Sequence, residues 1–81
     1  MSIKDDSILK RSPRRKIARH KIRHVLRQRI FDGQCPPGSK LIQQQLAKDF
    51  GVSMGVIREA LLELQAWGLV ETHDNRGIFV R

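Results

Sequence analysis

Most of the side chains that could bind a charged ligand are concentrated near the amino terminus. Residues 10–29 hold ten of the sixteen lysines and arginines and no acidic residue. These ten are Lys10, Arg11, Arg14, Arg15, Lys16, Arg19, Lys21, Arg23, Arg27 and Arg29. After this segment the charges nearly balance, so the net charge of +8 is confined to one end. Such one-sided positive charge indicates a polyanionic partner, and nucleic acid is the first candidate.

Side chains that could perform catalysis are few. The single Cys35 stands in the loop sequence CPPG without a recognisable base or second thiol nearby, so it is interpreted as filling space. His20 and His24 have the i, i+4 spacing of some metal sites, but no carboxylate or thiol joins them and the surrounding cations would repel a metal ion. No nucleophile and base pair and no phosphate-binding loop is recognisable. We therefore expect no enzyme activity, no cofactor and no metal site.

The size and composition of the chain limit its architecture. With 81 residues it can form one small domain. Charged residues make up 30% of the chain, and no run approaches the roughly 20 apolar residues of a membrane span. The amino terminus carries Asp5 and Asp6 and lacks the apolar stretch of a secretory signal. The sequence therefore predicts a cytoplasmic protein.

Residues 46–64 have the pattern of a short helix, a turn and a longer helix. Apolar residues recur in both halves at helical spacing, which predicts one apolar stripe on each helix. The stripes are formed by Leu46, Ala47 and Phe50, and by Ile57, Ala60, Leu61 and Leu64. Between them, Gly51 can end the first helix in a left-handed conformation, and Ser53 can cap the second. Stripes joined by so short a turn face each other, which is typical of a helix-turn-helix.

The segments before this unit are assigned from composition and turn residues. Residues 1–12 are polar and without a period, which predicts a disordered arm. A helix is predicted from Pro13, because proline fits the first turn of a helix. The next helix is predicted from about Gln43 to Phe50. Leu41 and Ile42, just before it, either form one short strand or anchor the start of that helix.

The segment after the long helix predicts a β-hairpin. Gly68 is suited to end the helix, and Trp67 before it is interpreted as a core residue rather than a platform for stacking bases. Two short strands are predicted at residues 69–72 and 78–80, with a polar tip between them. Because two strands are marginally stable alone, the hairpin must pack on the helices. The sequence thus predicts a mainly α fold, a winged helix-turn-helix of three helices and a two-stranded wing over residues 13–81.

The start of the longer helix is suited to approach DNA. Its residues include no acid, and the free N–H groups of a helix start attract phosphate. They are Ser53, Met54, Gly55 and Val56, of which Gly55 permits close approach. One turn further on the same face, Arg58 could bond to guanine O6 and N7 or contact a phosphate. The alternative is an intrahelical pair between Arg58 and Glu63.

Charges elsewhere define the other candidate contacts. Arg14 and Arg15, at the predicted start of the first helix, are interpreted as phosphate contacts rather than as part of a solvated face. Phosphate would repel Glu59 and Glu63, so we expect them to point sideways or to pair with basic residues of the first helix.

The predicted wing tip offers a second site of contact with DNA. Asn75, Arg76 and Gly77 provide a hydrogen-bond donor, a cation and a sharp turn. A thin cationic loop can enter the minor groove, where the potential is most negative. A solvated hairpin tip is an equally good interpretation of these three residues.

The combination of motifs resembles a known family. The segment GVSMGVIREALLELQAWGLVE followed by NRGIFV, with PPG, Leu41 and Leu46 upstream, resembles the N-terminal winged helix-turn-helix of GntR-family bacterial transcription regulators. The likeness covers about residues 14–81 and is greatest to the branch typified by the fatty-acid regulator FadR and its FCD-domain relatives.

The resemblance implies a mode of action. Members of the family bind a short pseudo-palindromic operator as homodimers, with recognition helices in the major groove and wings in the minor groove. A C-terminal domain binds a small-molecule effector and supplies much of the dimer interface. That domain would follow the last residue of this chain, so we expect the chain to be part of a longer, metabolite-responsive regulator. The operator, the effector and the choice between repressor and activator stay open.

The resemblance also assigns contacts by position. The family's DNA contacts fall on Gln44, Ser53, Met54, Gly55, Val56, Arg58, Arg76 and Gly77. Relatives usually have arginine in place of Gln44 and Met54, and often Thr-Pro in place of Gly55 and Val56. Arg58 is therefore the one helical arginine of the pattern that remains. We expect an altered operator preference, with Gln44 bonding adenine and Met54 or Val56 touching thymine methyl groups.

A second hypothesis belongs to a different class. The nearly neutral helix-turn-helix and the replaced arginines are compatible with a winged helix that serves as a protein-interaction module, docking through its basic first helix on an acidic partner. Sequence-specific binding of double-stranded DNA is the leading hypothesis.

Overall fold

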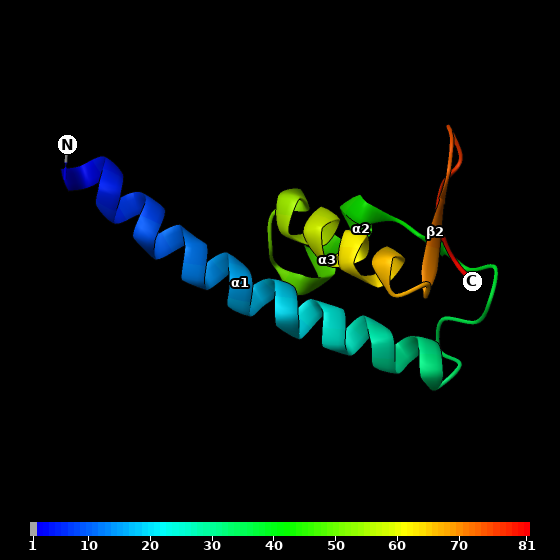
Figure 1. The fold of residues 1–81 in the computed structure, drawn as a ribbon. Helices are drawn as coiled ribbons and strands as arrows, with labels where there is room; N and C mark the ends of the chain where they lie inside the picture. The colour runs from blue at the N-terminus through cyan, green and yellow to red at the C-terminus, as the bar shows by residue number, and fades with distance from the viewer. Residues whose placement is uncertain (1) are drawn as a thin grey trace.

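Three helices and a small antiparallel sheet make up the structure, a computed structural model that describes the backbone of residues 2–81 and the side chains of residues 14–81 (Figure 1). The elements are α1 (Ser2–Phe31), β1 (Lys40–Leu41), α2 (Gln43–Phe50), α3 (Met54–Ala66), β2 (Val70–His73) and β3 (Gly77–Val80). Their order and kind confirm the predicted winged helix-turn-helix. None of the described helices is long and apolar enough to cross a membrane.

Helix α1 begins earlier than the sequence predicts. It starts at Ser2, so residues 2–12, predicted as a disordered arm, continue the helix, and Pro13 lies in its interior. No glycine interrupts this segment, and a proline removes one backbone donor without excluding helix on both sides. The start of the first helix therefore lies at Ser2 rather than at Pro13, while Met1 lies outside the described part. This end of α1 projects away from the other elements (Figure 1).

The core is formed where α3 packs between α1, α2 and the sheet. Its buried apolar residues are Ile22, Leu26, Leu41, Leu46, Ala47, Val56, Ile57, Ala60, Leu61, Leu64, Val70 and Val80. They include every member of the two predicted stripes except Phe50, which is half-buried and packs against the core. Of the three helices, α3 contributes the most residues to this core, because one of its faces meets α1, α2 and the sheet.

The turn between α2 and α3 has the predicted chemistry. Gly51 ends α2 with φ 66°, in the left-handed region that glycine enters without steric cost. The backbone N–H of Val56 donates to Oγ of Ser53 at 3.3 Å, so Ser53 caps α3. These two local features form the predicted turn, and together with the order of α2 and α3 they confirm the helix-turn-helix.

The sheet has three strands in the order β1-β3-β2, all antiparallel. Strand β3 is central, with Phe79 opposite Lys40 of β1 on one side and opposite Glu71 of β2 on the other. The first alternative for Leu41 is therefore correct in part: it belongs to a strand, while Ile42 is the residue before α2. The wing is thus a hairpin with a short third strand, rather than two strands alone.

Trp67 differs from its prediction as a core residue. It follows α3 directly, and its exposed fraction is 51%. The interior at this end of α3 is already filled by Leu64 and Val70. Trp67 packs instead beneath the guanidinium carbons of Arg23 and Arg27, which lie 4.8 and 5.7 Å from its ring centre.

Candidate nucleic-acid interface

The outward face of α3 includes exposed side chains at intervals of four residues. Met54, Arg58 and Leu62 occur at i, i+4 and i+8, on the opposite side from the buried stripe. The exposed fractions of Met54 and Leu62 are 39% and 60%. Sequence reasoning missed Leu62, although its spacing of four residues from Arg58 already placed it on this face. One arginine between two apolar side chains therefore forms the exposed ridge of the helix.

Arg58 is available for an external partner. The predicted alternative, an ion pair with Glu63, is absent, because the carboxylate of Glu63 faces α1. There it lies 2.7 Å from Nη1 of Arg23 and 3.4 Å from Nε of Arg19. Within residues 14–81, no acidic side chain forms an ion pair with Arg58.

Side chains of α1 and α3 alternate along the contact between the two helices. Glu59 lies 3.0 Å from Nη2 of Arg15 and 3.6 Å from Nη1 of Arg19. Glu63 forms ion pairs with Arg19 and Arg23. We call this series the interhelix ladder; it consists of Arg15, Glu59, Arg19, Glu63, Arg23, Trp67 and Arg27. The ladder confirms that Glu59 and Glu63 pair with the first helix. It also turns both carboxylates away from the exposed ridge of α3.

Arg14 and Arg15 have different environments in the structure. Arg14 is exposed, and among the described residues no carboxylate pairs with it. Arg15 donates to Glu59 and also crosses the first turn of α3, where a Cβ added at Gly55 would lie 2.8 Å from its Nη2. The space above Gly55, predicted to admit DNA, is thus occupied by a guanidinium.

Helix α2 contributes Gln44 to the surface. Gln44 is exposed near the start of the helix, whereas the amide nitrogen of its neighbour Gln45 donates to Asp49 at 2.9 Å. Among residues 14–81 no side-chain hydrogen bond engages Gln44, so its amide can exchange a donor and an acceptor with a base edge, as adenine requires.

The wing tip is a tight, exposed turn. The N–H of Arg76 donates to the carbonyl of His73 at 3.0 Å, and Asn75 has φ 61°. Asparagine is one of the few residues that tolerate this conformation at the third position of a turn. Gly77 follows with φ 119°, and a Cβ there would lie 2.9 Å from Cε of Lys40. The three predicted tip residues are thus brought together by backbone geometry.

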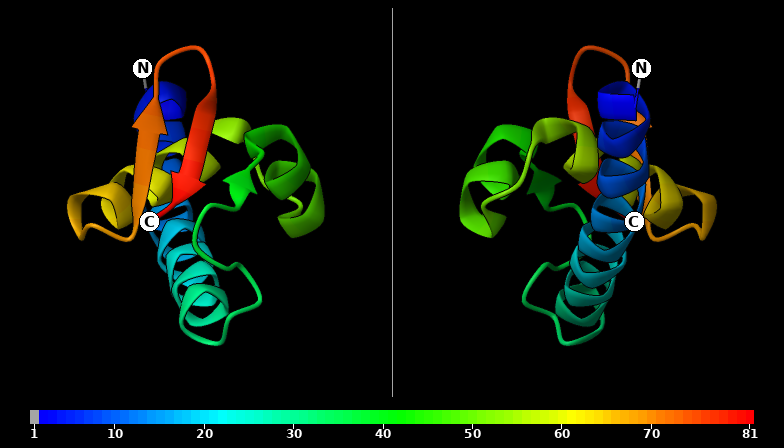
Figure 2. Two further views of the ribbon diagram at one scale, coloured as in Figure 1. Left: turned by 90° about the vertical axis from the view of Figure 1, so that its right-hand side faces the viewer. Right: turned by 90° about the vertical axis from the view of Figure 1, so that its left-hand side faces the viewer.

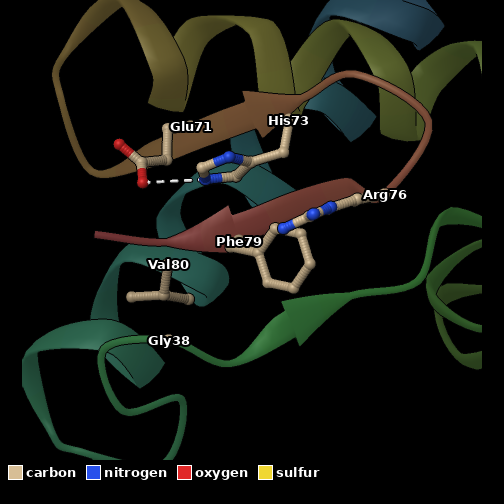
Figure 3. Close-up of a pocket in the computed structure, with 6 residues that line it drawn as sticks. All are labelled: Gly38, Glu71, His73, Arg76, Phe79 and Val80. Carbon is tan, nitrogen blue, oxygen red and sulfur yellow. Dashed lines mark hydrogen bonds and ion pairs between the residues drawn. The ribbon is translucent and has the colours of Figure 1, made fainter.

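One face of the wing carries a shallow hollow of about 250 Å³ (Figure 3). His73 bonds to Glu71 at 2.9 Å and meets Phe79 edge-to-face with 5.2 Å between ring centres. The side chain of Arg76 runs back from the tip into the same hollow. Arg76 therefore has to extend away from this face before it can enter a groove.

The cysteine and histidine residues considered for catalysis or metal binding contact other parts of the fold. Cys35 is half-buried and packs against the core, as its interpretation as a space-filling residue predicts. Nδ1 of His20 is hydrogen-bonded to Arg23. Within the described part of the chain, no three His, Cys, Asp or Glu side chains gather as metal ligands would.

The elements that carry the predicted contacts are arranged around α3, which contacts α1, α2 and the sheet. In Figure 2 the amino-terminal end of α1 and the wing tip both lie near the top of the molecule, and Figure 1 shows α2 and α3 between them, with α1 pointing to the left and the wing pointing upward. The carboxyl end of α1 lies at the bottom of the molecule in Figure 2, and the carboxyl terminus of the chain lies between that end and the wing tip.

Known proteins resemble this chain in both sequence and fold. Residues 18–80 match the family described as bacterial regulatory proteins, gntR family. The HTH-type transcriptional regulator YdhC of Bacillus subtilis is 42% identical over 55 residues, which are 68% of this chain and 25% of YdhC. LutR of the same organism is 43% identical over 53 residues, or 64% of this chain and 24% of LutR. This chain thus spans about a quarter of the length of these relatives.

Solved structures give the same result. A GntR family member from Pseudomonas syringae pv. tomato superposes with a TM-score of 0.74 at 43% identity, covering 80% of this chain and 27% of that protein. The DNA-binding domain of AraR, solved in complex with operator ORE1, gives a TM-score of 0.75 at 28% identity and covers 79% of each chain. The chain therefore belongs to the GntR family of bacterial regulatory proteins, and its fold is the winged helix-turn-helix DNA-binding domain of that family.

Proposed function

We propose that this chain reads a pseudo-palindromic operator as the DNA-binding part of a homodimeric, metabolite-responsive bacterial regulator. Helix α3 enters the major groove and the wing enters the minor groove. The observation that carries the proposal is Arg58, exposed and without an ion pair in residues 14–81, on the ridge between Met54 and Leu62. The DNA-binding domain of AraR, which superposes on this chain and was solved in complex with operator ORE1, supports the binding of double-stranded operator DNA.

The exposed side chains favour a mixed base preference. Arg58 has the forked donors that match O6 and N7 of guanine, and Gln44 can bond adenine. Met54 and Leu62 offer apolar surface to thymine methyl groups, and Arg76 supplies the cation for a narrow minor groove. The operator would then contain few guanines in each half-site, because the helix has one free arginine.

The regulated event belongs to the longer protein. The curated relatives are about four times as long as their aligned part, so the effector site and much of the dimer contact would lie outside this chain. Binding of an effector there would change the spacing of two winged helices, and operator affinity would change with it. We expect this to occur in the bacterial cytoplasm, on nucleoid DNA.

Replacing Arg58 by alanine tests the proposal. A duplex selected by the parent chain from a random pool serves as the operator, together with versions that carry single base-pair changes. Arg58→Ala should cost about 1–3 kcal/mol of binding free energy and relax the preference at one position per half-site. Arg81→Ala is the matched control, since it removes the same charge from a residue that lies 3.6 Å from Glu71. Unchanged discrimination in Arg58→Ala would show that another residue reads the base.

Arg14 tests the electrostatic part of the interface. As a phosphate contact, Arg14→Ala should weaken binding to every sequence to a similar extent and lower the slope of log affinity against log salt by about one. A mutant with the parental slope would assign Arg14 to a solvated face.

Docking of the basic first helix on an acidic protein has less support. Arg15, Arg19 and Arg23 are already paired with Glu59 and Glu63 inside the molecule. A gel shift with random duplex DNA at low and moderate salt separates the two functions. Absence of salt-sensitive binding would favour the interaction module.

A further inference from the structure

We infer that Glu59 is a positioning residue for DNA binding: it holds the guanidinium of Arg15 over Gly55, where Arg15 contacts an operator phosphate beside the first turn of α3. This inference rests on the proposed function, because it needs α3 to approach DNA through that turn. A general cationic attraction requires no fixed position for a side chain. Here Glu59 and Gly55 of α3 determine where the guanidinium of Arg15 lies.

Two distances locate the guanidinium of Arg15. Its Nη2 donates to Oε2 of Glu59 at 3.0 Å, and the same nitrogen lies 2.8 Å from the point where a Cβ would stand at Gly55. Gly55 and Glu59 are four residues apart and therefore lie above one another on one face of α3. The acid holds the guanidinium, and the missing side chain gives it room to cross the helix.

The contact with Glu59 leaves Arg15 able to bind a second anion. A guanidinium has five N–H donors, and in the structure one Arg15 nitrogen donates to the carboxylate. The side chain of Arg15 is 37% exposed. Its remaining donors can therefore reach a phosphate that approaches from solvent.

Glu59 is itself held from its other side. Nη1 of Arg19 lies 3.6 Å from its Oε1, an oxygen that is buried and has no hydrogen-bond partner within the described residues. The carboxylate is thus enclosed between two arginines of α1. Loss of its negative charge should raise DNA affinity if electrostatic repulsion were its only effect, whereas loss of a positioning residue should lower it.

Gly55→Ala separates position from charge. The added methyl group displaces the end of the Arg15 side chain, which is flexible, while alanine favours the helix more than glycine does. We expect a thermal midpoint equal to or above that of the parent. Affinity for the selected duplex should fall about tenfold, as for one lost charged hydrogen bond, and the salt slope should fall by about one at unchanged net charge.

Glu59→Gln and Glu63→Gln form the matched pair. Each removes one negative charge and weakens two ladder contacts, but Glu63 contacts Arg19 and Arg23 rather than Arg15. We expect Glu59→Gln to weaken binding of the selected duplex and Glu63→Gln to leave it equal or tighter. Circular dichroism melts of both variants report any loss of fold.

Arg15→Ala completes the experiment as a double-mutant cycle. In that background Gly55→Ala and Glu59→Gln should cause no further loss of affinity, because their effect passes through Arg15. Equal losses with and without Arg15 would overturn the inference and leave the proposed function standing. A parent chain that selects no sequence and shows no salt-sensitive binding would overturn the proposed function itself.

Discussion

The guanidinium carbon of Arg23 lies 4.8 Å from the centre of the Trp67 ring, at the exposed end of α3. Arg27 approaches the same ring at 5.7 Å, and its guanidinium also lies 5.3 Å from the ring of Phe31. In the interhelix ladder Trp67 thus takes the place of an acid, and it contacts Arg23 and Arg27 through the negative face of its aromatic ring. The interhelix ladder therefore connects α1 and α3 along most of α3. At the Trp67 end its contacts are cation–π contacts rather than ion pairs.

Trp67→Ala should reduce the free energy of unfolding by about 1 kcal/mol, the size of an exposed cation–π contact, rather than the ~3–5 kcal/mol of a buried tryptophan. Urea unfolding followed by far-UV circular dichroism measures it, since Trp67 is the only tryptophan and its fluorescence is lost. Leu64→Ala, at a site with 0% exposure, is the comparison and should cost about 2–5 kcal/mol. Equal costs for the two variants would contradict the surface role of Trp67.

Gly51→Ala should destabilise the domain by about 1–2 kcal/mol, because φ 66° places Cβ too close to the following carbonyl. A Cβ at this glycine meets no other atom within 4 Å, so the cost is confined to the backbone. Gly51→Asn should recover part of the loss, since asparagine tolerates the left-handed region. An asparagine variant as unstable as the alanine variant would require a steric cause instead.

Ser53→Ala should cost about 1 kcal/mol of stability through the lost cap on Val56 N–H. Ser53→Asp keeps a capping oxygen but places a negative charge at the helix start. We therefore expect Ser53→Asp to have parental stability and weaker binding of the selected duplex, measured by thermal melting and fluorescence anisotropy. Parental affinity in Ser53→Asp would place the first turn of α3 away from phosphate.

Arg76→Ala should weaken binding most for operators with A·T-rich segments under the wing, where a narrow minor groove concentrates negative potential. Competition between duplexes that differ only in those segments measures the effect. Arg81→Ala removes the same charge at the other end of the wing and serves as control. Equal effects of the two variants would identify Arg76 as part of a solvated tip.

The helix-turn-helix could be predicted because its determinants are local. The spacing of Ile57, Leu61 and Leu64 defines the buried face of α3, and a capping serine and a left-handed glycine define the ends of the turn. Each signal acts within one or two helical turns. From their charges, Glu59 and Glu63 were predicted either to point sideways or to pair with basic residues of the first helix. The structure has the ion pairs with α1.

The remaining features depend on which surfaces meet. The exposed position of Trp67 and the place of Arg15 over Gly55 follow from the face of α1 that packs on α3, which helical spacing in one segment does not determine. Strand β1 has two residues and exists because Ile78 and Phe79 pair with it from the other end of the chain. The helical segment before Pro13 was not predicted because an interior proline costs about 3 kcal/mol of helix stability, whereas a proline in the first turn fits without that loss.

The central position of β3 in the sheet determines when the sheet can form. Lys40 and Leu41 pair with Phe79 and Ile78, and β2 pairs with the same strand from its other side. During synthesis on the ribosome, α1, α2 and α3 leave the exit tunnel before the strand that joins both neighbours. The sheet therefore closes only after Val80 has emerged, and an interrupted chain that ends before Gly77 exposes Leu41 and Val70 as unpaired, apolar strand residues.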